Sequence, residues 1–226
     1  MTGGGDYAAI GALFLGAPAT AHSAEVSLYF GATVATEYVS DGIRFSNGPT
    51  VQPYVELGFA GLHAGAYVSN VDANLTGANA EYDLSVGRRG EAGKLGYNIG
   101  IAYYSYDEAV ADYPAGDSAE TCGSVTLAAT DTLYLTVKAA FAPENDQTNL
   151  SMRADYDPAL DGLSVGAIIG QVNSNYGDWN YWSINAACAV FDKVSAGLAY
   201  HDTNLDPALG LADRSGLIVT SSSLAL

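Results

Sequence analysis

The stretch VSLYFGATVATEY, residues 26–38, decides the fold. Apolar side chains recur at alternate positions along it, and polar side chains fall between them. The apolar set is Val26, Leu28, Phe30, Ala32, Val34 and Tyr38, and the polar set is Ser27, Thr33 and Glu37. A period of two is typical of a strand with one apolar face and does not fit an amphipathic helix. We therefore expect a half-buried strand, with Tyr38 on its apolar face.

The same alternation recurs along nearly all of the chain after this strand and predicts about twelve strands. The remaining strands are expected at 51–59, 62–70, 80–88, 95–106, 122–129, 132–141, 149–156, 163–170, 180–190, 194–201 and 215–226. Short connections alternate with longer ones, which are expected at 39–50, 71–79, 107–121, 142–148, 171–179 and 202–214. Short turns at one end, long loops at the other and an even strand number are typical of a bacterial outer-membrane barrel.

The predicted fold class is therefore all-β, a transmembrane antiparallel β-barrel with short periplasmic turns and longer extracellular loops. A soluble β-sandwich is the structural alternative, because it also alternates apolar and polar residues at short spacing. A sandwich gives no reason for every second connection to be long. It also does not need strands of ten or more residues, as a tilted membrane-crossing strand does.

The first 24 residues are expected to be a secretory signal peptide, and residues 25–226 the barrel. An apolar segment runs from Ala8 to Ala17, and small residues suited to cleavage follow it up to Ala24. The segment before Ala8 carries Asp6 and has no Lys or Arg, which departs from the usual signal pattern. A buried N-terminal helix is the alternative interpretation.

The charge balance argues against a nucleic-acid partner. Eight Lys and Arg residues against 25 Asp and Glu residues give a net charge of −17. Binding of phosphate backbones needs clustered cations, and only Arg88 and Arg89 stand together. The two cysteines, Cys122 and Cys188, have no metal or redox spacing, and the strand map places them on opposite faces of the wall. We expect two unpaired thiols.

Several segments resemble the TorF-like family of proteobacterial outer-membrane porins. Within residues 33–59 the resemblance is carried by Thr36-Glu37-Tyr38, Gly42-Ile43 and Ser46-Asn47-Gly48, and it continues through 62–72 and 178–206. Asp41 stands where the family usually has arginine, and the chain ends in Leu226 where barrels commonly have an aromatic residue. The resemblance implies a β-barrel in the outer membrane and names no substrate.

No residue pattern indicates an enzyme, a metal site or a cofactor. His63 and His201 stand alone in alternating strands, whereas a zinc site needs three or four converging ligands. The stretch GRRGEAGKL, residues 87–95, has no Ser or Thr after Lys94 and fails as a phosphate loop. The acidic loops could bridge to divalent ions on lipopolysaccharide, but solvated loop acidity is the default interpretation. The expected partners are therefore outer-membrane lipid, lipopolysaccharide and small hydrophilic solutes or cations.

The polar phase of the strands predicts which side chains line the lumen of the barrel, if the apolar phase faces lipid. These residues are Glu37, Gln52, Glu56, His63, Glu81, Asp83, Asn98, Lys138, Arg153, Asp155, Asn185 and His201. Five carboxylates against two fixed cations indicate a mildly cation-attracting interior. The sequence thus predicts a small porin for passive diffusion of small hydrophilic solutes. The alternative is a closed, non-conducting barrel with a structural, adhesive or complex-forming role.

Overall fold

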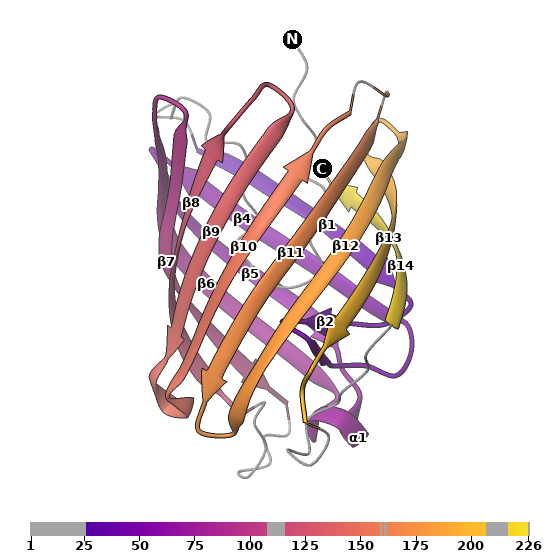
Figure 1. The fold of residues 1–226 in the computed structure, drawn as a ribbon. Coiled ribbons are helices and arrows are strands. Elements are labelled where there is room, and N and C mark those ends of the chain that lie inside the picture. Colours follow the sequence, from indigo (N-terminus) through magenta and orange to yellow (C-terminus); the bar gives the residue numbers. More distant parts are fainter. Residues whose placement is uncertain (1–25, 108–115, 159, 161, 207–216, 226) are drawn as a thin grey trace.

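The computed structural model describes residues 26–107, 116–158, 160, 162–206 and the backbone of 217–225. Within these residues the strands form one closed antiparallel barrel (Figure 1). The predicted signal peptide, residues 1–24, lies outside the described residues. None of the helices that the structure describes is long and apolar enough to cross a membrane.

Twelve strands make the wall of the barrel. They are β1 (Ser27–Ala35), β4 (Thr50–Phe59), β5 (Leu62–Asn70), β6 (Ala80–Ala92), β7 (Leu95–Tyr106), β8 (Ser118–Ala128), β9 (Leu133–Ala142), β10 (Gln147–Tyr156), β11 (Leu163–Ser174), β12 (Gly177–Phe191), β13 (Val194–Thr203) and β14 (Leu217–Ala225). Each pairs with its neighbours along the chain, and β1 closes the barrel by pairing with β14 from Gly31↔Ala225 to Ala35↔Ser221. The predicted fold class is confirmed.

Two of the connections predicted to be long are short. Strand β11 continues to Ser174 and β12 begins at Gly177, so residues 175–176 are a tight turn in place of a loop over 171–179. Between β9 and β10 only a short 3-10 helix, η1 (Pro143–Asn145), and Asp146 intervene. The backbone pairing continues into polar sequence beyond the apolar band, because strand hydrogen bonds do not depend on apolar side chains. The alternation therefore predicted the apolar part of each of these strands but not the residues at which the strands end.

The outer face of the barrel carries exposed apolar side chains with aromatic residues toward both ends. The end of the barrel that carries connections such as 60–61 and 93–94 is called the short-turn end. Four exposed aromatic residues lie toward it: Phe59, Tyr97, Tyr156 and Phe191. Tyr82, Tyr103, Phe141 and Trp182 lie toward the opposite, long-loop end. Exposed aliphatic residues lie between these two groups, among them Leu57, Val86, Ile99, Val137 and Ile184. Paired aromatic girdles around an apolar band are typical of a barrel that crosses a membrane.

The first connection at the long-loop end, residues 36–49, folds into the mouth of the barrel and is called the inserted loop. It contains a small hairpin of β2 (Val39–Ser40) and β3 (Ile43–Arg44), drawn within the lower end of the barrel in Figure 1. Asp41 and Gly42 both have positive φ, as a two-residue hairpin turn of type I′ requires. The sequence predicted a long connection over residues 39–50 but not its position inside the barrel.

Tyr38 is where the prediction from strand parity was wrong. It was expected on the apolar outer face, but it is buried inside the mouth, with 3% of its surface exposed. The reason is that β1 ends at Ala35 and the chain turns inward, so the alternation no longer relates Tyr38 to Val34.

Two apolar clusters fix the inserted loop. On one side Val172, Trp179, Tyr181 and Leu205 form a buried cluster, and Ile43 packs against it. On the other side Tyr38, Val71 and Ala78 form a second cluster, with Phe45 and Tyr106 packed against them. The rings of Tyr38 and Phe45 stack at 4.9 Å. Both of these clusters thus lie at the long-loop end.

Candidate functional site

The inserted loop is held against the inner wall by contacts that its sequence makes possible. The indole Nε1 of Trp179, on β12, donates a 2.8 Å hydrogen bond to the carbonyl oxygen of Asp41. Gly42 lies so close to β12 and β13 that an added Cβ would come within 2.8 Å of Tyr181 Cβ and 2.9 Å of Thr203 Oγ1. Only glycine combines this close approach with a φ of +84°. The hairpin therefore crosses the mouth in one defined position.

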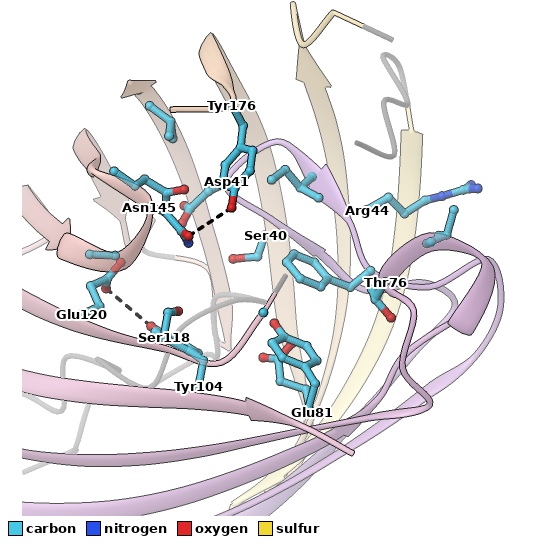
Figure 2. A pocket seen from close by; sticks show the side chains of 18 of the residues that line it. Ser40, Asp41, Arg44, Thr76, Glu81, Tyr104, Ser118, Glu120, Asn145 and Tyr176 are labelled. Carbon is cyan, nitrogen blue, oxygen red and sulfur yellow. Dashed lines mark hydrogen bonds between the residues drawn. The ribbon is translucent and has the colours of Figure 1, made fainter. Parts of the chain in front are cut away.

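A cavity of about 120 Å³ lies between the inserted loop and the inner wall (Figure 2). Asp41 and Arg44 line it from the loop, and Glu81, Tyr104 and Glu120 line it from β6, β7 and β8. Further lining residues from strands on both sides of the mouth are Tyr106, Ser118, Ala142, Gln147, Val172 and Trp179. Because the inserted loop narrows the barrel here, a solute that passed through the barrel would meet these residues.

Glu81 and Asp83 form the most deeply buried acidic pair of the cavity region, with 1% and 2% of their surfaces exposed. The hydroxyl of Tyr38 donates to Glu81 Oε1 and that of Tyr106 to Glu81 Oε2, both at 3.0 Å. Burial, reinforced by the neighbouring Glu81, raises the pKa of the Tyr38 phenol well above its ordinary value. Tyr38 therefore stays protonated and acts as a donor. Asp83 adjoins Glu81 as the next inward-facing residue of β6.

Glu120 brings a second carboxylate to the cavity from the neighbouring wall. Its Oε1 accepts from the hydroxyl of Tyr104 at 3.4 Å, as the dashed line in Figure 2 shows. The ammonium Nζ of Lys138, on β9, lies 3.9 Å from the same oxygen. Arg44 is paired with Glu37 at 3.1 Å, and its guanidinium points away from Glu81 and Glu120 (Figure 2). The cations nearest to the cavity therefore already have carboxylate partners.

The predicted lumen residues nearer the short-turn end form a compact network of their own. Glu56 pairs with the guanidinium of Arg89, and His63 Nδ1 lies 3.9 Å from Glu56 Oε2. His63 Nε2 is hydrogen-bonded to Asn98 Oδ1 at 2.9 Å. The ring of His63 lies over Gly87, where an added Cβ would come within 2.6 Å of it. The structure thus brings together three predicted residues and one, Arg89, that was expected in a turn.

The remaining predicted residues lie on the wall opposite this network or at the mouth. Arg153 Nε and Nη2 both donate to Asp155 on the same strand, at distances of 2.6–2.8 Å. Asn185 and Asp155 meet over Gly166, since a Cβ there would lie 2.7 Å from one side chain and 3.0 Å from the other. His201 is half-buried on the inner side of β13. Gln52, near the mouth, is buried and donates to Ser69 Oγ at 3.5 Å.

Sequence reasoning missed several residues of the cavity region. Glu120 was placed in a loop because the strand was expected to begin at residue 122, although extending the alternation back from Cys122 by two residues would have found it. Extending the strand expected at 80–88 would likewise have placed Arg89 inside. For Asp41, Arg44 and Trp179 no sequence signal was available, because their role depends on the path of the inserted loop.

Three loop carboxylates at the long-loop end, those of Asp72, Asp107 and Asp117, have structural partners. Asp72 accepts from the backbone N–H of Asn74 and caps the short helix α1 (Ala73–Thr76). This hydrogen bond, together with one from Asn47, lowers the pKa of Asp72. Asp107 accepts from the backbone N–H groups of Asn79 and Ala80, and Asp117 from that of Tyr106. These carboxylates order loop backbone at the long-loop end.

Two further kinds of side chain were considered in the sequence: the cysteines and the residues that could bind a metal ion. Cys122 is buried on the inner side and Cys188 is exposed, so the predicted placement on opposite faces is confirmed. Among the described residues no three His, Cys, Asp or Glu side chains come together as metal ligands would.

Comparisons with known proteins agree with this fold. A family model described as "Bacterial protein of unknown function (Gcw_chp)" matches residues 18–223. A search of curated proteins gives no match. Among solved structures, the KdgM porin superposes with a TM-score of 0.63 at 9% identity, covering 87% of this chain and 98% of that one.

Two further solved structures give similar values. The KdgM porin in complex with disordered oligogalacturonate gives a TM-score of 0.59 at 9% identity, with 87% of this chain and 96% of that chain covered. The NanC porin gives 0.57 at 9%, with 88% and 98% covered. At this level of identity the likeness concerns the fold, which is that of a porin barrel.

Proposed function

Because the chain belongs to the Gcw_chp family and folds as a porin barrel, we propose that it is an outer-membrane channel for passive diffusion of small hydrophilic solutes. The observation that carries the proposal is the pairing of a lipid-type outer face with a polar inner wall. Exposed apolar residues with two aromatic girdles cover the outside, while buried carboxylates, amides and cations face inward. The resemblance of the sequence to TorF-like porins supports the same function.

The proposed orientation places the long-loop end outside the cell, as in other bacterial outer-membrane barrels. The inserted loop and the cavity would then be the first constriction that an entering solute meets. Outer-membrane lipid and lipopolysaccharide would surround the apolar band and the aromatic girdles. Residues 1–24 would be removed as a signal peptide during export.

We further propose that the channel prefers cations. Four inward-facing ion pairs cancel most of the interior charge: Glu37–Arg44, Glu56–Arg89, Glu120–Lys138 and Asp155–Arg153. Asp41, Glu81 and Asp83 make no ion pair with any described residue, and Asp41 and Glu81 line the cavity. Glu81 and Asp83 are hydrogen-bonded to each other, so the two share a proton and together contribute one negative charge beside that of Asp41. Fixed negative charge at a narrow point raises the local concentration of cations.

The negative charge at the constriction also predicts solutes that differ in charge from the ligand of one structural neighbour. One KdgM structure is a complex with oligogalacturonate, which is a polyanion. Carboxylates at the constriction of this chain would repel such a ligand, since like charges in a low-dielectric passage repel strongly. We therefore propose neutral and cationic solutes, not acidic oligosaccharides.

A closed barrel is the second candidate, and one observation favours it. The inserted loop is packed on both sides by apolar clusters, Val172–Trp179–Tyr181–Leu205 and Tyr38–Val71–Ala78, which would hold it across the mouth. In that case the protein would serve a structural, adhesive or complex-forming role. A test of function must therefore distinguish a narrow open channel from a closed barrel.

Recording from the refolded protein in a planar bilayer with a KCl gradient makes that distinction. We expect small unitary currents and a reversal potential on the cation side, reduced in the double variant Glu81→Gln, Asp83→Asn. The matched control is Glu91→Gln, Asp131→Asn, which makes the same two substitutions at exposed positions at the short-turn end and should leave selectivity unchanged. No current from folded protein would favour the closed barrel, and anion preference would refute the charge argument.

A further inference from the structure

We propose that Arg88, on the outer face of the barrel near the short-turn end, binds the phosphate of an anionic glycerophospholipid in the surrounding leaflet. This inference rests on the proposed membrane location and does not depend on whether the barrel conducts. It assigns a role to residues 87–95, a stretch that the proposed channel does not explain. The position of Arg88, its lack of an ion-pair partner in the described part of the chain and a neighbouring tyrosine carry the inference.

Among the residues that the structure describes, Arg88 is the only Lys or Arg that points outward from a strand of the wall. Leu84 and Val86 share the outer face of β6 with it and are exposed. Arg89, the next residue, points inward and pairs with Glu56. A cation on the lipid-facing side is costly at the membrane midplane and tolerated near the interface. Arg88 should therefore lie close to the lipid headgroups.

The strand pairing agrees with a position of Arg88 at the edge of the apolar band. Its Cα partner on β5 is Leu62, the first residue after the turn at 60–61. Its Cα partner on β7 is Ile99, which belongs to the apolar band. An arginine at this depth can keep its methylene groups among apolar side chains and extend its guanidinium to the headgroup region.

The guanidinium of Arg88 forms no ion pair with any described carboxylate. The other arginines that the structure describes, Arg44, Arg89 and Arg153, each have a carboxylate partner inside the barrel. A guanidinium presents its N–H donors in a planar fork that fits two oxygens of one phosphate. The phosphodiester of a phospholipid is the anion that a membrane supplies at this depth.

Tyr97 gives the outer face a second polar group beside Arg88. It is exposed on β7, and its Cα partner on β6 is Gly90. A Cβ added at Gly90 would come within 2.6 Å of the Tyr97 hydroxyl, so the phenol lies across β6 over this glycine. Arg88 and Gly90 are successive outward-facing positions, roughly 7 Å apart along the strand. The hydroxyl and the guanidinium can therefore donate to the same phosphate group.

The charges of this hairpin favour an anionic headgroup over a zwitterionic one. Lys94, in the turn between β6 and β7, is exposed and adds a second cation, whereas Glu91 falls on the inward-facing register of β6. A zwitterionic headgroup also brings its own ammonium, which competes with arginine for the phosphate. The whole chain has a net charge of −17 and would repel anionic lipid. Preferential binding of anionic lipid would therefore indicate a local site.

Native mass spectrometry of the refolded protein in detergent tests the assignment, with phosphatidylglycerol and phosphatidylcholine of the same acyl chains as probes. We expect the first phosphatidylglycerol molecule to bind more tightly than the first phosphatidylcholine molecule. Arg88→Gln should weaken phosphatidylglycerol binding about fivefold and should affect phosphatidylcholine less. The matched control is Arg89→Gln, which removes the same charge from the inner face one residue away. This control should bind phosphatidylglycerol as the unmodified protein does.

Three further variants sharpen the test. Arg88→Lys keeps the charge but loses the planar fork, so it should weaken binding less than Arg88→Gln does. Tyr97→Phe removes the hydroxyl and should weaken binding about twofold. If Arg89→Gln does not fold, because Glu56 loses its partner, Lys193→Gln replaces it as the control, since Lys193 is exposed in the turn of a different hairpin at the same end.

Three outcomes would overturn the proposal. These are equal affinity of the unmodified protein for both lipids, equal weakening by Arg88→Gln and by the control, and preferential binding of lipid A through Arg88. The last outcome would place the short-turn end in the leaflet that contains lipopolysaccharide. A barrel that conducts no current but binds phosphatidylglycerol through Arg88 would refute the proposed channel and support this site.

Discussion

Ile184 and Asn185 are adjacent residues of β12 and should respond oppositely to the same substitution. Ile184 is the central residue of the strand and is 54% exposed on the outer face. Arginine at the midplane of a membrane barrel costs roughly 2 to 4 kcal/mol, which lowers the folding equilibrium constant about 30- to 700-fold. Ile184 lies in the apolar band, one outward-facing position from Trp182 of the long-loop girdle, so Ile184→Arg should destabilise the barrel by about 2 kcal/mol, the lower end of that range.

Asn185→Arg places the same side chain on the inner face, where the structure supplies a carboxylate. Asn185 and Asp155 approach each other over Gly166, which has no side chain to separate them. An arginine at this position would share Asp155 with Arg153 and should cost less than about 1 kcal/mol.

Reversible unfolding in lipid bilayers, followed by tryptophan fluorescence over a denaturant series, measures both substitutions. The difference between the two free energies of unfolding is the quantity of interest, because it cancels the intrinsic effect of introducing arginine into a strand. Equal destabilisation by both substitutions would mean that both faces of β12 are packed in a dry interior. That result would refute the membrane-barrel assignment of the outer face.

Two further predictions concern the inner wall and the N-terminus. A Cβ added at Gly170 would overlap the ring of Tyr181, so Gly170→Ala should cost about 1 to 3 kcal/mol of stability in the same unfolding assay. The control is Gly96→Ala, which should cost much less because the nearest heavy atoms to an added Cβ are 4.0 Å away. We expect the mature protein to be cleaved near Ala24 and to be found in the outer-membrane fraction. Measuring the intact mass of the purified chain checks the cleavage. An uncleaved chain in the cytosol would contradict the predicted signal peptide.

The alternation of the sequence was sufficient to predict the wall of the barrel. A period of two determines which side chains share a face, so the positions of Glu56, His63 and Asn98 followed from parity once each strand was located. Their mutual contacts depend on the register between neighbouring strands, for example His63↔Gly87 and Gly87↔Gly100. Register is set by turns and by strand stagger, which the apolar pattern does not report.

The candidate site was less predictable because it depends on a loop. Parity failed at Tyr38, the third residue after β1 ends, and it carried no information about Asp41 or Arg44. A two-residue Asp-Gly turn indicates a hairpin, but it does not say whether the hairpin points outward or into the mouth. That choice follows from tertiary contacts, namely the hydrogen bond from Trp179 to Asp41 and the close fit of Gly42.

Counting charged residues also gave an incomplete account of selectivity. The sequence suggested five interior carboxylates against two cations, which describes a charge spread along the lumen. In the structure the cations Arg44, Arg89, Lys138 and Arg153 each have a carboxylate partner, so their charge has little effect on a passing ion. The carboxylates that remain without an ion pair, Asp41, Glu81 and Asp83, are concentrated where the inserted loop narrows the barrel. Because field strength at a constriction governs passage more than total charge does, cation preference should depend on these residues and not on the ion-paired network of Glu56.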